Sequence, residues 1–129
     1  MPENKKIFIC DDDEEALTSL RKLLELSGFE VKATKKPREV MATIKAFRPD
    51  VILLDLLMPD IGGLEVCEIL NQDEETRNIP IIIISVLAGQ IDIKKAYKLG
   101  VLGYFTKPYD FNDVLREINK VISFKAGKK

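Results

Sequence analysis

The 129-residue sequence contains no histidine, and this absence excludes more chemistry than any other feature of its composition. Without imidazole the chain has no Ser-His-Asp or Cys-His catalytic centre, no histidine metal ligand and no histidine proton switch. Any chemistry must depend on carboxylates, hydroxyls, lysines or the two cysteines, Cys10 and Cys67. Both cysteines lie in apolar runs and form no C-x-x-C motif, so we interpret them as ordinary buried thiols.

Long hydrophobic runs and an excess of one charge are also missing. No apolar stretch approaches the ~18 residues of a membrane span, and residues 1–6 contain no apolar signal core. Lys and Arg total 20 and Asp and Glu total 21, a formal net charge of -1 that is not typical of proteins that bind nucleic acid or anionic membranes. We expect a cytoplasmic protein with one domain at residues 1–124 and a flexible basic tail at residues 125–129.

Short hydrophobic runs divide the chain at regular intervals. The unbroken apolar runs at residues 7–10, 51–54 and 79–84 are typical of strands that are buried on both faces. Residues 29–34 alternate with period two, as a half-exposed edge strand does, and residues 102–106 are typical of a short fifth strand. The sequence therefore predicts five strands.

Segments with helical period separate these runs. They extend from Asp13 to a stop at Gly28, from Pro37 to Pro49, from the residue after Gly62-Gly63 onward, from residue 90 to 99 and from residue 111 to 122. Strands that alternate with helices form a mostly parallel sheet covered on both faces, so the predicted fold class is a doubly wound α/β domain, written (βα)5.

Polar side chains stand where the predicted strands end. They are Asp11 and Asp12 after the first strand, Asp55 after the third, Ser85 after the fourth and Lys107 after the fifth. Each has a structural explanation by itself, such as capping a helix or ending a strand. Asp55 fits such an explanation least, because no polar residue stands within four positions before it or three after it. Since parallel strands end at one edge of a sheet, we expect these groups to meet there.

This combination of groups predicts a magnesium site. Three carboxylates at one edge repel one another unless a cation enters or protons stay bound. Oxygen ligands without nitrogen or thiolate select a hard ion such as Mg²⁺. A divalent cation and Lys107 beside Asp55 suit an incoming phosphoryl group, which a carboxylate nucleophile would accept as an aspartyl phosphate. Ser85 is then a hydrogen-bond donor to a phosphate oxygen.

From about residue 5 to residue 124 the chain resembles the receiver domain of bacterial two-component response regulators, including the single-domain chemotaxis regulators. The resemblance is carried by four motifs in characteristic order and spacing, which are Asp11-Asp12, residues 55–65, Ser85 and residues 104–108. It implies a flavodoxin-like five-stranded parallel sheet in the order 2-1-3-4-5.

The resemblance also assigns roles to individual residues. It makes Asp55 the phosphoacceptor, and it makes Asp11, Asp12, Asp55 and the backbone carbonyl of Leu57 the ligands of Mg²⁺. Lys107 is expected to contact the phosphoryl oxygens and to precede a cis peptide bond to Pro108. Ser85 and Tyr104 are expected to switch the face formed by the fourth helix, the fifth strand and the fifth helix.

The resemblance implies partners as well. The phosphoryl donor would be a histidine kinase or a histidine phosphotransfer protein, and the output would go to a downstream protein or to an output domain outside this chain. No contact with nucleic acid or membrane is expected. The protein would be a switch that assists its own phosphorylation and dephosphorylation, and not a classical enzyme.

Several residues depart from the family pattern. Val86 stands where the family usually has Ala or Gly, and Leu57 and Leu87 are apolar where members that dephosphorylate rapidly often carry polar side chains. We therefore expect a long-lived phosphoryl group. Residues 100–104 lack the acidic pair that DNA-binding regulators use in dimer salt bridges, so that dimer is not expected.

Three alternative functions are compatible with parts of the pattern. Val86 leaves open a receiver-like interaction module that works without phosphorylation, although the intact acidic, Ser and Lys positions argue against it. A magnesium phosphohydrolase would use Asp55 as its nucleophile, although Asp55-Leu56-Leu57 lacks the second carboxylate that serves such enzymes as acid and base. A flavin-binding protein would share the topology, although the acidic residues 11–15 would repel the cofactor phosphate.

Overall fold

The computed structural model describes residues 4–58 and 61–126. The strands are β1 (Lys6–Cys10), β2 (Glu30–Thr34), β3 (Val51–Leu54), β4 (Ile81–Ser85) and β5 (Gly103–Thr106). The helices are α1 (Glu14–Leu26), α2 (Val40–Phe47), α3 (Gly63–Gln72), α4 (Gln90–Lys98) and α5 (Phe111–Ala126), and a short 3-10 turn at Pro37–Glu39 precedes α2. All the pairings are parallel and the sheet order is β2-β1-β3-β4-β5, which confirms the predicted (βα)5 fold.

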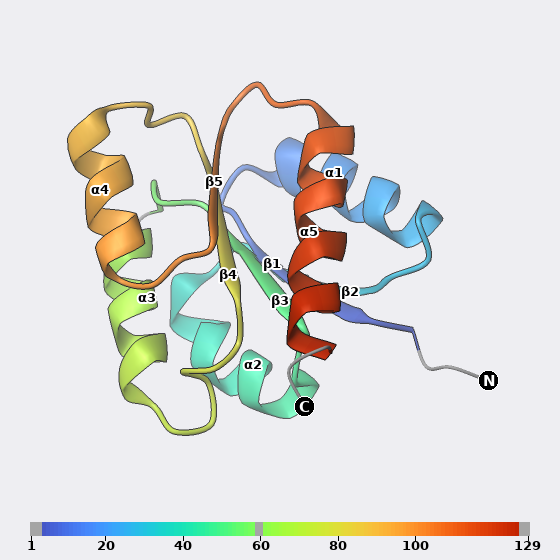
Figure 1. Cartoon of the computed structure of the whole chain (residues 1–129), viewed down its shortest axis with the longest axis horizontal. Coiled ribbons are helices and arrows are strands. Elements are labelled where there is room, and N and C mark those ends of the chain that lie inside the picture. The colour runs from blue at the N-terminus through green and yellow to red at the C-terminus, as the bar shows by residue number, and fades with distance from the viewer. Residues whose placement is uncertain (1–3, 59–60, 127–129) are drawn as a thin grey trace.

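The sheet is a central layer between two layers of helices (Figure 1). Helices α1 and α5 pack on one face, where Ile7 and Leu53 are buried, and α2, α3 and α4 cover the other face, where Phe8 and Leu54 are buried. Successive side chains of a strand point to opposite faces. Because both faces are covered, β1 and β3 must be apolar at almost every position, and this explains the unbroken apolar runs.

Local signals place both ends of α1. The side chain of Asp13 caps the helix by accepting hydrogen bonds from the backbone N–H groups of Glu15 at 3.1 Å and Ala16 at 3.4 Å. Gly28 follows the helix with a φ of 99°, in the left-handed region that favours glycine. The first turn of α1 therefore begins directly beside the acidic pair Asp11-Asp12.

Three predicted boundaries shift for identifiable reasons. Pro37 opens a 3-10 turn, so α2 itself begins at Val40. β4 begins at Ile81 and not at Ile79, because Pro80 has no N–H for the ladder and Ile79 N donates to Thr76 O in the preceding turn. α5 continues to Ala126, two residues past the expected domain boundary, and residues 127–129 of the expected tail lie outside the described residues.

Membrane-spanning elements are absent from the described ranges 4–58 and 61–126, where no helix combines the length and the apolar character that crossing a bilayer requires.

Candidate functional site

The carboxyl ends of four strands deliver polar groups to one edge of the sheet. Asp11 follows β1, Asp55 follows β3, Ser85 ends β4 and Lys107 follows β5. Hydrogen bonds of the ladder continue past the strand ends, from Asp55 N to Cys10 O at 3.0 Å and from Lys107 N to Ser85 O at 2.8 Å. The backbone is thereby held in register up to the residues that carry the candidate chemistry.

Lys107 lies between two buried carboxylates. Its Nζ donates to Asp11 Oδ2 at 2.8 Å and to Asp55 Oδ2 at 3.0 Å, and both aspartates are only 6% exposed. Burial raises the pKa of Asp11, against the opposing effect of the hydrogen bond from Lys107. Burial also lowers the pKa of Lys107, but the hydrogen bonds to Asp11 and Asp55 outweigh it and the net shift is upward. The peptide bond between Lys107 and Pro108 is cis, as the resemblance implied.

Three carboxylates could hold a metal ion at this edge. One oxygen each from Asp11, Asp12 and Asp55 lies within 4.8 Å of the others, and Asp12 is exposed to solvent. The backbone orients the two buried members, because Asp11 Oδ1 accepts from Asp13 N at 2.9 Å and Asp55 Oδ1 accepts from Leu57 N at 3.0 Å. A donor set made only of oxygen, with one side open to water, fits Mg²⁺.

The two predicted switch residues meet at Leu87. Ser85 is fully buried, and its Oγ accepts a hydrogen bond from Leu87 N at 3.2 Å. Tyr104 Oη donates to the carbonyl oxygen of Leu87 at 2.6 Å, and burial, followed by the charge of Asp92, raises the pKa of Tyr104. The β4–α4 connection is thus held at both polar backbone groups of one residue, Leu87, by side chains from β4 and β5.

Apolar side chains stand next to these groups. Leu57 is 47% exposed and Val86 is 56% exposed, whereas Leu87 is partly buried against the core formed with α2, α3 and α4. The departures from the family pattern therefore place apolar surface beside Asp55 and Ser85.

Sequence reasoning missed the close approach of Gly63 to the phosphoacceptor candidate. A Cβ atom on Gly63 would lie 2.4 Å from Asp55 O and 2.6 Å from Leu56 Cα, which is too close for any side chain. The sequence pattern places the pair Gly62-Gly63 just before a helix and within the motif at residues 55–65, and it predicts no close contact with Asp55. A glycine in the first turn of a helix, where Ala is far more favourable, was the available signal of close packing.

The interpretation of the cysteines is confirmed, with one contact that no pattern indicated. Both thiols are free and buried, and burial raises the pKa of each to about 12, so neither is a reactive thiolate. Cys10 Sγ lies 3.3 Å from Met58 Sδ, within reach of a weak S–H hydrogen bond. This contact links the end of β1 to the segment that follows Asp55.

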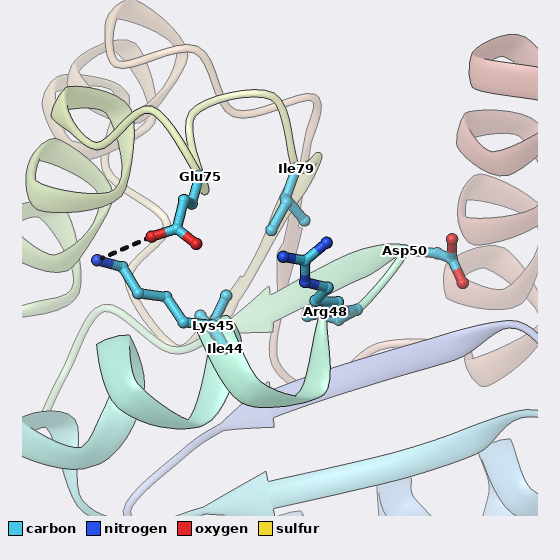
Figure 2. Close-up of a pocket in the computed structure, with 7 residues that line it drawn as sticks. Ile44, Lys45, Arg48, Asp50, Glu75 and Ile79 are labelled. Atoms are coloured by element: carbon cyan, nitrogen blue, oxygen red, sulfur yellow. Dashed lines mark ion pairs between the residues drawn. The ribbon is translucent and has the colours of Figure 1, made fainter.

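A separate hollow of about 330 Å³ lies at the opposite end of the sheet, where β3 and β4 begin (Figure 2). Lys45 and Glu75 form an ion pair of 3.5 Å across its mouth, and Lys45 also pairs with Asp73 at 2.9 Å. None of the predicted site residues lines this hollow. The acidic edge and this hollow are therefore different places in the fold.

The carboxylates, the hydroxyl and the lysine lie at the carboxyl edge of a doubly wound sheet. The protein is therefore a doubly wound α/β protein with its candidate site at the carboxyl ends of the strands. Residues 7–119 match the family described as the response regulator receiver domain, and the chain belongs to that family. This confirms the resemblance that the motifs indicated.

Individual relatives are similar over most of this chain. It is 35% identical over 104 residues to the polar-differentiation response regulator DivK of Brucella anthropi. The aligned residues make up 81% of this chain and 85% of DivK. It is 32% identical over 120 residues to protein RcaC of Microchaete diplosiphon. The aligned residues make up 90% of this chain but only 18% of RcaC. The chain thus spans less than a fifth of RcaC and most of DivK.

Solved structures share the fold. A CheY-like receiver domain from Methanospirillum hungatei has a TM-score of 0.91 at 25% identity, covering 98% of this chain and all of the other. The chemotaxis response regulator CheY4 of Vibrio cholerae has a TM-score of 0.85 at 23% identity, covering 92% of this chain and 99% of the other.

Proposed function

We propose that this chain is a phosphoacceptor switch in two-component signalling, phosphorylated on Asp55 in a reaction that requires Mg²⁺. The observation that carries this proposal is the contact of Lys107 Nζ with both Asp11 and Asp55 at the edge where three carboxylates converge. One cation, one nucleophile and a metal-binding set at a single point are the groups that phosphoryl transfer needs.

Asp55 is the nucleophile in this proposal. A carboxylate oxygen of Asp55 forms a bond to phosphorus while the bond from phosphorus to the imidazole nitrogen of the donor breaks, and the released imidazole takes up a proton. Lys107 stays within hydrogen-bond reach and neutralises charge on the phosphoryl oxygens. Because this chain has no histidine, the phosphohistidine belongs to a histidine kinase or a histidine phosphotransfer partner.

Asp11, Asp12 and Asp55 would hold the metal ion, with the backbone carbonyl of Leu57 as a further ligand. When bound, Mg²⁺ supplies positive charge that offsets the phosphoryl oxygens and the acidic cluster. Asp11 already receives a hydrogen bond from Asp13 N, which restrains the orientation of its carboxylate.

Ser85 and Tyr104 would convert phosphorylation into a change of shape. A phosphoryl oxygen that accepts a hydrogen bond from Ser85 would draw the hydroxyl toward Asp55 and away from Leu87 N, and so would act on the same residue whose carbonyl oxygen Tyr104 holds. Inverting a 1:99 population needs about 5.5 kcal/mol, which two or three hydrogen bonds to a charged group can provide at roughly 1.5–3 kcal/mol each. The affected surface is the α4, β5 and α5 face.

The chain acts in the cytoplasm in this proposal and is not a classical enzyme. Its upstream partner supplies the phosphoryl group, and a downstream protein, or an output domain outside this chain, reads the α4, β5 and α5 face.

The test is incubation with Mg²⁺ and acetyl phosphate, followed by intact mass measurement. We expect one added phosphoryl group in the unmodified sequence and in Asp113→Asn, a control at an exposed carboxylate, and none in Asp55→Asn or without Mg²⁺. Release of phosphate without an adduct would support a hydrolase instead. Neither adduct nor release would favour the phosphorylation-independent module.

A further inference from the structure

A groove of about 480 Å³ lies between the first turns of α3 and the last turns of α4. The last turns of α4 reach α3 (Figure 1), and the side chain of Asn71 on α3 donates a hydrogen bond to Leu99 O at the end of α4. Leu64 and Leu99 form an apolar, partly buried floor. The groove is therefore a formed feature of the fold, with walls on two elements.

The two walls carry opposite charges. Glu65 and Glu68 are exposed on α3, and Lys95 and Lys98 are exposed on α4. Each pair is three residues apart, so both members lie on the same side of their helix. Within residues 4–58 and 61–126, no ion pair engages any of these four groups.

Opposite walls make the groove complementary to itself. A two-fold axis in the plane of the interface, parallel to the groove, exchanges the walls, so that α3 of one copy lies over α4 of the other. Glu65 and Glu68 of each copy then face Lys95 and Lys98 of the other, and the apolar floors meet at the centre. A partner of a single charge sign would be repelled by one of the two walls.

We propose that the α3–α4 groove is a self-association surface, and that a second copy of this chain occupies it through two-fold related pairing of its acidic and basic walls. Two further observations favour a second copy as the occupant. Helix α4 buries only Ala96 among its nine residues, which leaves most of its surface available. The net charge of -1 imposes almost no overall repulsion between copies.

The chemistry of the surface predicts the character of the dimer. The contact would be confined to the groove and its two walls, so the association should be weak and reversible. The facing charges are exposed at the rim, so salt should weaken the dimer further. Neither Asp55 nor Lys107 lines the groove, so self-association can be measured in the unphosphorylated protein.

Sedimentation equilibrium of the full chain from about 10 μM to about 1 mM tests the proposal. We expect a concentration-dependent dimer that weakens in high salt. Glu65→Lys with Glu68→Lys makes both walls basic, and Lys95→Glu with Lys98→Glu makes both walls acidic. Each double variant should self-associate at least about tenfold more weakly, whereas an equimolar mixture of the two should form a heterodimer. Combining all four substitutions in one chain should restore the homodimer.

A control that is matched to Lys95→Glu with Lys98→Glu makes the same change of charge on another face of the molecule. Lys22→Glu with Lys120→Glu, at exposed positions of α1 and α5, should leave the association unchanged. A chain that stays monomeric over the whole concentration range overturns the proposal. So does a dimer that the wall variants leave intact, or a pair of wall variants that does not associate on mixing. Because the readout uses unphosphorylated protein, failure here is distinct from failure of the phosphoacceptor proposal.

Discussion

At the scale of single residues, Lys107 balances more charge than any other described side chain of the site. It contacts two carboxylates that are each 6% exposed, and its own side chain is 18% exposed. Removing one partner from a buried charge cluster leaves the other charges uncompensated in a medium that solvates them poorly. We therefore expect the lysine to contribute to stability, in addition to its proposed role in phosphoryl binding.

Replacing this lysine should destabilise the protein in a pH-dependent way. In the absence of Mg²⁺ at neutral pH, Lys107→Met should lower the free energy of unfolding by about 3 kcal/mol. The folded pKa of Lys107 is raised, so its contribution is fully present below its ordinary pKa of about 10.4 and is lost as pH rises through the folded pKa. Urea unfolding between neutral and alkaline pH measures both effects.

Comparing how the free energy of unfolding changes with pH in the unmodified sequence and in Lys107→Met isolates the contribution of the lysine. Burial also raises the pKa values of Tyr104 and Tyr109, so unfolded tyrosines lose their protons first and stability falls with rising pH in both proteins. The decline should be steeper in the unmodified sequence than in Lys107→Met. Parallel profiles would contradict the role assigned to Lys107.

The apolar residues beside the site should affect how long the phosphoryl group persists. Leu57 is 47% exposed and Leu87 is partly buried, so neither presents a group that orients an attacking water molecule. Leu57→Asn with Leu87→Glu should accelerate hydrolysis of the aspartyl phosphate by at least about tenfold. Loss of the phosphoryl adduct with time, followed by intact mass, measures the rate, and an unchanged rate would refute the expectation of a long-lived phosphoryl group.

At the scale of elements, the start of α3 is packed directly against the backbone of Asp55. The two atoms nearest to a Cβ at Gly63 would be Asp55 O and Leu56 Cα, which are main-chain atoms that cannot rotate away. The position of α3 and the position of the candidate nucleophile are therefore coupled through the main chain.

Adjacent glycines provide a matched test of this coupling. Gly63→Ala should lower the free energy of unfolding by about 1–3 kcal/mol, because the new methyl group forces α3 or the Asp55 segment to move. Gly62→Ala should cost less, because its Cβ would come no closer than 4.0 Å to Leu56 O. Urea unfolding of both variants measures the difference, and equal effects would show that Gly63 is not a close-packing position.

At the scale of the whole molecule, the acidic edge joins segments that are far apart in the sequence. Asp11 and Asp12 follow β1 and Asp55 follows β3, the two central neighbours of the sheet. A ligand that binds this set only in the folded chain stabilises the entire fold by mass action.

Magnesium should therefore raise the melting temperature. At a concentration 100 times its dissociation constant, Mg²⁺ should add about 2.7 kcal/mol, which for a domain of this size corresponds to a rise in Tm of roughly 10 °C. EDTA should reverse the shift. Asp12→Asn removes an exposed ligand and should abolish most of the shift without loss of folding, and a full shift in this variant would contradict the assigned metal set.

The sequence by itself determined the elements and the edge at which the polar groups lie. Both-face burial forces unbroken apolar runs such as residues 51–54, and Asp13 and Gly28 carry their own capping and stopping chemistry. Asp11, Asp55, Ser85 and Lys107 could be assigned to one edge because the ends of parallel strands must meet. These predictions depend on capping and burial rules for neighbouring residues or on the order of strands and helices. Both can be read from the amino-acid sequence.

Only the tertiary structure decided which of these groups touch. The approach of Gly63 to Asp55 O, the contact of Cys10 with Met58 and the two hydrogen bonds at Leu87 join segments that no local pattern connects. The facing charges of α3 and α4 are likewise ordinary helix-surface residues until the two helices pack against each other. Such contacts depend on how the side chains and backbones of distant segments fill a common space, and packing of that kind is specified by the whole chain at once.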